Sequence, residues 1–336
     1  MMPGDLAALV PKLAGHRVLV VGDVILDEYL IGRTDRLSRE APIPVLEFDR
    51  REYIPGGAAN PSMNIAALGS HAIQVGVVGA DADATTLRSI LQAKGIDPAG
   101  LVTDPSRPTT TKTRIMAHMG LRFPQQVARI DRIDRRPVNG EIEQRIRAGL
   151  ESLVLQANAV MISDYLTGLL TAQVVAAVRE LSRSHQILAT ADAQGQLDKY
   201  AGFDLVKCNA EEAMRCVGRH LATDDDFAGA GLQMITDLDL RGGVLITRGP
   251  EGVTLIQRDQ AVHHLPAVHV EDVYDTVGAG DTVLAVVTLA LTAGAAYADA
   301  AALANIAAGI VVRKVGNYAP SPAELIAAIS EQHDNS

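Results

Sequence analysis

The sequence has no tryptophan, few other aromatic residues and little cysteine. Aromatic residues make up 3% of the 336 residues, which argues against a protein that stacks nucleic-acid bases on rings. Cys208 and Cys216 give neither a disulfide framework nor the spacing of a zinc site, so we expect two reduced thiols. The nine histidines show no metal-binding spacing, and a metal centre built from histidine is not expected.

Basic residues and long apolar runs are also scarce. There are 30 Lys and Arg against 40 Asp and Glu, a formal net charge of −10, whereas a general binder of nucleic acid or anionic membranes carries positive charge. The longest uncharged run, Thr282 to Ala298, is shorter than the roughly 20 residues of a membrane-spanning helix. The stretch from Met1 to His16 lacks the apolar core of a signal peptide. We therefore expect a cytoplasmic protein that binds neither nucleic acid nor membrane.

Hydrophobic residues are abundant, at 48% of the total, and occur in short runs that alternate with helical patterns. Several runs are almost continuously apolar, which is typical of strands buried on both faces. Strands are expected at 17–24, 73–78, 159–163, 186–191, 205–208, 244–247 and 253–256, and helices at 59–68, 84–94, 140–156, 171–184, 210–217, 226–237, 279–292, 297–312 and 322–332. This alternation predicts an α/β fold, a mainly parallel central sheet with helices on both faces, in a single domain over 1–336.

Two segments interrupt the alternation. Residues 31–55 and 107–132 contain prolines, many charges and extended runs. We expect them to form a small, discontinuous β lid on the α/β body. Because exposed strand edges seek partners, we also expect the lid to pair with a second copy in a homodimer.

The strongest local motif runs from Asp275 to Asp281 and precedes a long apolar helix pattern. Gly278 and Gly280 let the backbone approach a ligand closely, and a helix start offers free N–H groups and a positive dipole end to an anion. Asp281 falls in the first helical turn, where the dipole favours its ionised form and makes it a weak base. The structural alternative for this residue is a helix cap or dipole partner.

Other motifs place polar residues at the ends of expected strands and the starts of helices. Gly56 and Gly57 precede Asn60 at a helix start, and an asparagine side chain can both donate to and accept from a polyol hydroxyl. Asp27 follows the first expected strand, at the edge where parallel sheets bind ligands. A plain turn with solvated side chains is the alternative for each.

Two further motifs follow later strands. Asn209 and Glu212 match a capping box at the start of the helix over 210–217, while Thr247 and Gly249 lie in a turn between two strands. A purely structural role, as a helix cap and a hairpin turn, remains the alternative for these two motifs.

Taken together and in this order, these motifs resemble the ribokinase-like, or PfkB, family of sugar kinases. The resemblance covers nearly the whole chain, from Val18 to about Pro322, and it implies a ribokinase-like fold. Within the family, the sequence is most similar to bacterial kinases of D-glycero-β-D-manno-heptose 7-phosphate. The narrower match is carried by residues 22–27, 40–45, 56–60, 163–165 and 273–275.

The resemblance implies ATP and Mg²⁺ as cofactors and a role for each matching residue. Asp281 would be the base that accepts the proton of the attacking hydroxyl, and the backbone N–H groups of Gly278, Ala279 and Gly280 would form an anion hole for the transferred phosphoryl group. The nucleotide would contact Asn209, Glu212, Thr247, Gly249 and Asn305, with Glu212 holding Mg²⁺ through water. The sugar would contact Asp27, Gly56, Gly57 and Asn60, and Asp275 would belong to a site for a monovalent cation such as K⁺.

The sequence departs from the family pattern at three positions. Val277 stands where many members have threonine, and Thr167 and Gln194 stand where lysine is usual. Two cationic contacts to phosphate are therefore missing, and other basic residues have to compensate. Related bifunctional enzymes carry a further nucleotidyltransferase domain, so we expect this chain to be the kinase half.

A local excess of basic residues gives a separate indication of the substrate. Residues 105–136 contain eight Lys and Arg and two acids, a local charge of +6, which suits a phosphorylated sugar. Lys112, Arg114 and Arg129 are the candidate contacts to a phosphate remote from the reacting hydroxyl, and strand alternation puts Lys112 and Arg114 on one face. A solvated basic strand pair is the alternative.

These observations lead to one expected function and two alternatives. The resemblance implies ATP-dependent phosphorylation of the 1-hydroxyl of D-glycero-β-D-manno-heptose 7-phosphate, which gives the 1,7-bisphosphate used in ADP-heptose and lipopolysaccharide inner-core synthesis. The alternatives are a family kinase for another sugar phosphate or a nucleoside, and a non-catalytic sugar or nucleotide sensor on the same fold. A pure sensor has no need of the base Asp281.

Overall fold

The computed structural model describes residues 3–34, 36–118, 124–268, 275–314 and 316–334. Its body is built on a nine-stranded sheet with the order β13-β12-β11-β10-β9-β8-β1-β4-β5. The strands are β1 Arg17–Gly22, β4 His71–Val78, β5 Asp97–Thr103, β8 Ala159–Asp164, β9 Leu188–Ala193, β10 Leu205–Asn209, β11 Gly243–Thr247, β12 Val253–Gln257 and β13 Val262–Leu265. Neighbouring strands from β5 to β11 are parallel, and β12 and β13 complete the edge in antiparallel fashion.

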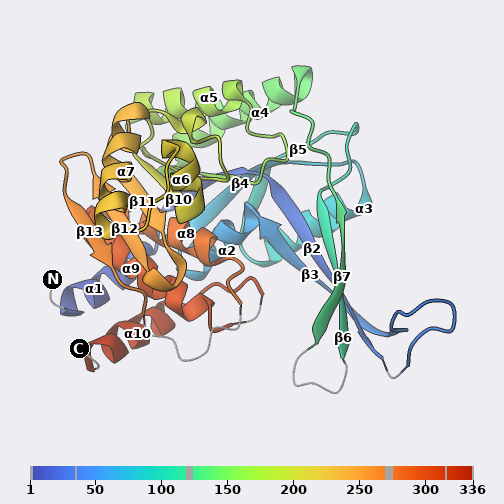
Figure 1. The fold of residues 1–336 in the computed structure, drawn as a ribbon. Helices are drawn as coiled ribbons and strands as arrows, with labels where there is room; N and C mark the ends of the chain where they lie inside the picture. The colour runs from blue at the N-terminus through green and yellow to red at the C-terminus, as the bar shows by residue number, and fades with distance from the viewer. Residues whose placement is uncertain (1–2, 35, 119–123, 269–274, 315, 335–336) are drawn as a thin grey trace.

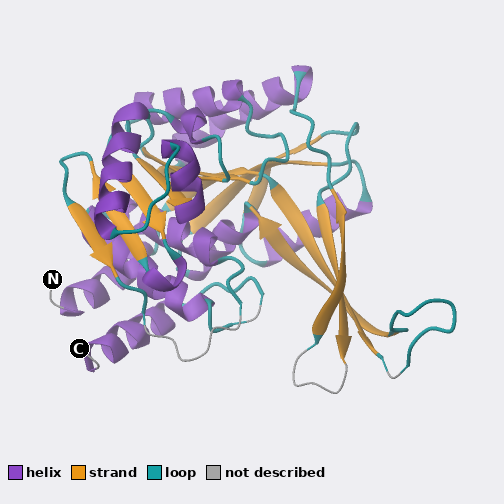
Figure 2. Ribbon diagram, in the orientation of Figure 1, coloured by secondary structure: helices purple, strands orange, loops and turns teal. Residues whose placement is uncertain are grey.

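Helices cover both faces of this sheet (Figures 1 and 2). One face carries α1 Pro3–Leu9, α2 Ala59–Ala67, α3 Ala82–Ala93, α8 Ala279–Thr292, α9 Tyr297–Val311 and α10 Pro322–Asp334. The other carries α4 Gly140–Leu153, α5 Ala172–Ser184, α6 Ala210–Val217 and α7 Asp224–Asp237. The α/β fold with a mainly parallel sheet is therefore confirmed, and the helices over 210–217 and 279–292 lie where the sequence predicted them.

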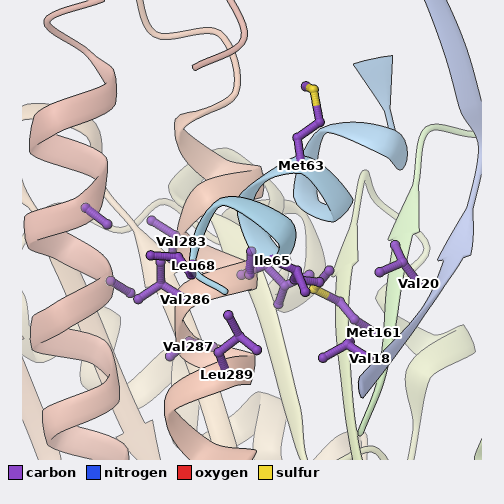
Figure 3. Packing of buried hydrophobic residues seen from close by; sticks show 14 of the residues in the cluster. Val18, Val20, Met63, Ile65, Leu68, Met161, Val283, Val286, Val287 and Leu289 are labelled. Atoms are coloured by element: carbon purple, nitrogen blue, oxygen red, sulfur yellow. The ribbon is translucent and has the colours of Figure 1, made fainter. Parts of the chain in front are cut away.

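Successive residues of the central strands enter two different cores. In β1, Val18 and Val20 pack toward α2 and α8, whereas Leu19 and Val21 pack toward the opposite helices. Figure 3 shows the first of these cores, with Met161 of β8 beside the apolar residues of α2 and α8. Burial on both faces explains why these strands are continuously apolar in the sequence. It also fixes α2 and α8 side by side on one face of the sheet, and both helices contribute to the candidate site.

A second sheet of four strands, with the order β3-β2-β6-β7, extends away from the body (Figure 1). We call it the small sheet; its strands are β2 Val24–Arg33, β3 Glu47–Gly57, β6 Thr111–His118 and β7 Gln125–Arg132. It begins at Val24, earlier than the expected lid segment at 31–55. Asp27 follows the first strand of the body, as expected, but that strand ends at Gly22 rather than at Val24, and Asp27 lies within the next strand, β2.

Some boundaries and strands differ from the sequence-based expectation for local reasons. The strand expected over 186–191 begins at Leu188, because Gln186 takes a left-handed conformation with φ 54° after α5. β5 was not predicted, since it contains Pro98 and Gly100, both unfavourable in strands. Within the described residues, no helix combines the length and apolar character that crossing a membrane requires.

Candidate active site

A cavity of about 930 Å³ opens at the carboxyl ends of β10 and β11, beside the start of α8 and one side of α9. Its lining includes six of the residues singled out in the sequence, namely Asn209, Thr247, Gly249, Ala279, Gly280 and Asn305. Two of them also bond to the backbone: the Asn305 amide donates to the Pro266 carbonyl at 2.7 Å, and the Thr247 hydroxyl to the Cys208 carbonyl at 3.4 Å. The volume and the mixed polar and apolar lining suit a ligand of nucleotide size.

Asn209 and Glu212 form the capping box expected at the start of α6. The Asn209 side chain accepts from the Glu212 N–H at 2.9 Å, and the Glu212 carboxylate accepts from the Asn209 N–H at 2.7 Å. Glu212 is buried, and its burial raises the pKa of its carboxyl group. The structural role is thus present, and it fixes the Glu212 carboxylate to the backbone of Asn209, which lines the cavity. Among the described residues there is no cluster of three metal-binding side chains.

The start of α8 is shaped by Gly278, the residue that precedes the helix. Gly278 has φ 81°, a conformation that favours glycine, and a Cβ there would lie 2.6 Å from Nδ2 of Asn60. The helix then begins at Ala279, so the N–H groups of its first turn point out of the helix start without intrahelical acceptors. Backbone donors at a helix start form an anion-binding site, in agreement with the position of Ala279 and Gly280 in the cavity wall.

Asp281 lies in that first turn and is buried with 7% of its surface exposed. Its Oδ2 accepts from Asn60 Nδ2 at 2.8 Å, and the Tyr165 hydroxyl donates to both carboxylate oxygens at 3.1 and 2.9 Å. Burial, together with the charge of Asp192, raises the pKa of Asp281 to about 6. The expectation of a weak base is therefore wrong, because desolvation outweighs the helix dipole and the donated hydrogen bonds.

Tyr165, to which the sequence analysis gave no role, reaches Asp281 through a tightly held loop after β8. The buried Asp23 carboxylate accepts from the backbone N–H groups of Tyr165, Thr167 and Leu169 at 3.0, 3.0 and 3.3 Å. Burial raises the pKa of the Tyr165 hydroxyl well above its ordinary value, so the hydroxyl stays protonated and donates. The motif at 163–165 had signalled the position but not this contact, which crosses 116 residues of sequence.

Asn60 of α2 donates a hydrogen bond to the Asp281 carboxylate, and its side-chain oxygen remains available to a ligand. Its side chain is 1% exposed, and its Oδ1 is buried with no hydrogen-bond partner among the described residues. A buried polar atom without a partner is costly, and a ligand hydroxyl would satisfy it. Gly57, at φ 56°, is explained by the turn into α2, since a Cβ there would lie 2.3 Å from the Asp23 carbonyl oxygen.

Asp27 lies on the face of the small sheet that is turned toward the Tyr165 loop, and only 4% of its surface is exposed. Its carboxylate pairs with Arg114 Nη1 at 2.6 Å and accepts from Asn317 Nδ2 at 3.2 Å. Gly56 is needed beside it, because a Cβ there would lie 2.2 Å from Asp27 Oδ2. Asn317, absent from the sequence-based site, comes from the segment between α9 and α10.

The three basic candidates differ in their surroundings. Arg114 is already paired with Asp27, and Arg129 lies on an exposed strand where it makes a two-bond ion pair with Asp131 at 2.8 and 3.0 Å. Lys112 Nζ lies 5.6 Å from the centre of the Tyr165 ring, and among the described residues no carboxylate is within ion-pair distance of it. Burial lowers the pKa of Lys112. Arg122, which belongs to the same basic segment, lies outside the described residues.

Asp275 organises a turn before α8. Its carboxylate accepts from the Val277 N–H at 2.9 Å and from the Gly316 N–H at 3.0 Å. Val277 is 46% exposed and supplies no side-chain oxygen. The neighbouring Val273 and Tyr274, which carried part of the sequence resemblance, lie outside the described residues.

Lys207 of β10 also lines the cavity, although the sequence analysis did not single it out. Lys207 lies in a short apolar run, which predicts a strand and nothing more. Its ion-pair partner, Asp192, stands opposite it on the neighbouring strand β9, and the sequence alone does not reveal which strands are neighbours.

Comparison with known proteins places the chain in a family. The model of the pfkB family of carbohydrate kinases matches residues 16–324. The protein named bifunctional protein HldE from Geobacter metallireducens is 42% identical over 319 residues, which cover 95% of this chain and 64% of that protein. The HldE of Pseudomonas aeruginosa is 39% identical over 323 residues, covering 96% and 65%. The chain thus spans about two thirds of the length of these relatives.

Solved structures show the same fold at lower sequence identity. Phosphofructokinase-2 from Escherichia coli in complex with substrates and products superposes with a TM-score of 0.74 at 20% identity, covering 94% of this chain and 98% of that one. The ribokinase of Arabidopsis thaliana complexed with ribose and ATP gives 0.71 at 19% identity, covering 94% and 99%. With this fold and a family match over most of its length, the chain belongs to the pfkB family of carbohydrate kinases.

Proposed function

We propose that the protein is an ATP-dependent kinase that phosphorylates the 1-hydroxyl of D-glycero-β-D-manno-heptose 7-phosphate, giving the 1,7-bisphosphate and ADP. The observation that carries this proposal is the position of Asp281. Its buried carboxylate, with the pKa raised to about 6, lies at the start of α8 next to the cavity and bonds Asn60 and Tyr165. A base of this pKa is ionised at neutral pH and still takes up a proton readily.

The chemistry follows from the charges that phosphoryl transfer develops. Its transition state is loose, so catalysis depends on positioning and on neutralising charge on the transferred group. The N–H groups of Gly278, Ala279 and Gly280 would supply fixed dipoles for that charge. Asp281 would take the proton of the sugar hydroxyl, and its neighbours Asn60 and Tyr165 hold it in one orientation.

The nucleotide would occupy the cavity along Thr247, Gly249 and Asn305, with its phosphates toward Asn209 and the start of α8. Mg²⁺ prefers to keep several waters and to bind through one or two carboxylates and substrate phosphates. Glu212 fits this requirement as a single carboxylate bonded to the backbone of Asn209, a residue of the cavity lining, and the ion would neutralise phosphate charge when bound. Asp275 is the proposed ligand of a monovalent cation such as K⁺.

The sugar would lie between the small sheet and α2. Asp27 would accept sugar hydroxyls, and Gly56 leaves room beside it. Gly57 would contact the sugar through its backbone, and the unpartnered Oδ1 of Asn60 would accept a further hydroxyl. Lys112 is the proposed contact of the remote phosphate, because Arg114 and Arg129 are already paired with carboxylates. The 7-phosphate assignment also draws on the relatives named HldE, which match 95% of this chain.

A homodimer through the small sheet is part of the proposal. The face opposite Asp27 places Leu30 beside Ile115 across β2 and β6. On the same sheet, Ile130 is 59% and Phe48 is 68% exposed. Exposed apolar groups of this kind favour burial against a partner. We expect Ile130→Glu to give a monomer by light scattering, whereas a wild-type protein that is itself monomeric at micromolar concentration would contradict the dimer.

The decisive experiment measures ADP release with a panel of acceptors. The panel holds the heptose, its 7-phosphate, hexose phosphates and nucleosides, each with wild type and with Asp281→Asn. We expect the 7-phosphate to have the highest kcat/KM and the variant to lose turnover with every acceptor. A better hexose phosphate or nucleoside would assign a different family kinase, and ligand binding without ADP release would indicate a sensor.

A further inference from the structure

Lys207 is a buried cation in the wall of the cavity, next to the start of α8. It lies near the end of β10, its residue surface is 6% exposed, and it lines the cavity together with Ala279 and Gly280. A Cβ placed on Gly280 would lie 2.6 Å from Lys207 Nζ. The ammonium group is therefore in direct contact with the backbone that forms the proposed anion hole.

The ammonium group has more donors than the surrounding protein uses. Lys207 Nζ donates to Asp192 Oδ2 at 2.8 Å, and the described residues provide no second acceptor for it. An ammonium carries three N–H donors, so two remain available to a ligand in the cavity that Lys207 lines. Burying a charge with unmet donors is costly, and the oxygens of a bound phosphoryl group would satisfy them.

The charges around Lys207 keep it protonated. Burial alone would lower its pKa, but the carboxylates of Asp192, Asp281 and Glu212 outweigh burial, and the pKa of Lys207 is raised. The group is thus a positive charge in the cavity wall, beside Gly280. Lys207 is also close to the position where relatives carry a lysine and this chain has Gln194. Its register partner on the next strand, Asp192, stands only two residues before Gln194.

We propose that Lys207 is a catalytic residue that donates hydrogen bonds to the transferred phosphoryl group, and that Asp192 is a positioning residue that holds it there. This inference rests on the proposed kinase function. In the step, the bond from the γ-phosphorus to the bridging oxygen breaks and leaves its electron pair on ADP. A bond forms from that phosphorus to the sugar oxygen, whose proton passes to Asp281. Lys207 keeps its proton throughout.

The test compares two nucleotides that differ in the γ-phosphate. Binding of ADP and of the β,γ-imido analogue of ATP, both with Mg²⁺, is measured by calorimetry for wild type and Lys207→Met. Hydrogen bonds from a charged donor lead us to expect a loss of roughly 10–100-fold in affinity for the imido analogue, with ADP changed by less than about 3-fold. Asp192→Asn should show the same selective loss at a smaller size.

Removal of one partner from a buried ion pair also destabilises a protein, so folding is controlled separately. The double variant Lys207→Met with Asp192→Asn removes both charges and should regain thermal stability while keeping the selective loss. A matched control is Lys199→Met. Lys199, in the short 3-10 helix Leu197–Tyr200, pairs at 3.2 Å with the buried Asp164 at the end of β8 but does not line the cavity. The ratio of the two affinities should therefore stay at the wild-type value.

The outcomes separate this inference from the proposed function. An unchanged affinity ratio in the folded single and double variants would overturn it, and Lys207 would then only tie β9 to β10. A selective loss in a protein that transfers no phosphate to the heptose 7-phosphate would refute the substrate assignment and still support the role of Lys207. Equal losses for ADP and the imido analogue would also overturn it, because the contact would then not involve the γ-phosphate.

Discussion

Two buried aspartates stand on opposite sides of the candidate site and are held in different ways. Asp281 on α8 is bonded by the neutral donors Asn60 and Tyr165, and burial raises its pKa to about 6. Asp27 on the small sheet is paired with the Arg114 guanidinium at 2.6 Å. The Asp281 carboxylate, with its raised pKa, can exchange a proton near neutral pH, whereas Asp27 is positioned as a hydrogen-bond acceptor by its contact with Arg114. The same side chain is thus prepared for proton transfer on one side and for binding on the other.

The elements that carry the two aspartates also differ. Asp281 rests on a helix packed between the large sheet and α9, and Asp27 on a sheet that extends from the body. We expect changes on the body side to act on turnover, and changes on the small-sheet side to act on recognition of the sugar. The following predictions test that division, from the largest expected effect to the smallest.

Replacing the base should have the largest effect. Asp281→Asn keeps the size of the side chain and removes proton acceptance, so turnover should fall roughly 10²–10⁴-fold. Nucleotide binding, measured by calorimetry with ADP, should change little. Turnover near the wild-type value under conditions where chemistry limits the rate would show that Asp281 is not the base.

The phosphate contact should come next. Lys112→Ala should lower kcat/KM for the heptose 7-phosphate roughly 10–200-fold, since charge-assisted contacts to phosphate are worth about 1.5–3 kcal/mol. The unphosphorylated heptose should be much less affected. Arg129→Ala is the matched control, because its guanidinium is exposed and paired with Asp131; we expect a change below about 3-fold there. Equal losses on both sugars would refute a phosphate-binding role for Lys112.

The pH dependence should reveal the contact between Tyr165 and the base. In the wild type, kcat/KM should fall below about pH 6, where Asp281 becomes protonated. Tyr165→Phe removes a hydrogen bond that favours the ionised form, so the pKa should rise and the acid limb should move to higher pH, by on the order of one unit. Tyr200→Phe removes a similar buried bond, to Asp164 at 2.6 Å, and should leave the limb in place. If the pH profiles of kcat/KM for wild type and Tyr165→Phe had the same acid limb, the hydrogen bond from Tyr165 to Asp281 would be contradicted.

The smallest effect concerns stability. A carboxyl whose pKa is raised on folding costs stability above its folded pKa and costs nothing below its unfolded one. Asp281→Asn should therefore stabilise the protein at pH 7.5, by up to about 3 kcal/mol for a shift from 3.8 to about 6. The melting temperature should rise by on the order of a few degrees, and this gain should disappear toward pH 4. An unchanged or lower melting temperature at pH 7.5 would mean that the ionised carboxylate is not penalised.

The fold could be predicted largely from local patterns, but the site only in part. Apolar runs gave the buried strands, and α6 and α8 were placed because a capping box and a glycine-rich turn mark their starts. The separate strand β2 was missed because only Asp23 interrupts the apolar run that continues from β1 into β2. The contacts of Tyr165 and Lys207 were not predictable, since each joins elements that only the folded sheet brings together. The pKa of Asp281 likewise depends on burial, which its position in a helix start does not reveal.

The bonds that hold the two aspartates also set the order in which the site can form. The bond from Asn60 to Asp281 spans 221 residues of chain, and the bond from Asn317 to Asp27 spans 290. Contacts between such distant segments form late, because the entropy of closing large loops must first be overcome. The packing of α2 against α8 in the first core joins the same distant segments, so Asp281 gains its Asn60 partner only when that core forms. Phosphoryl transfer would therefore require the complete core, and a chain with native secondary structure but without this packing would be inactive.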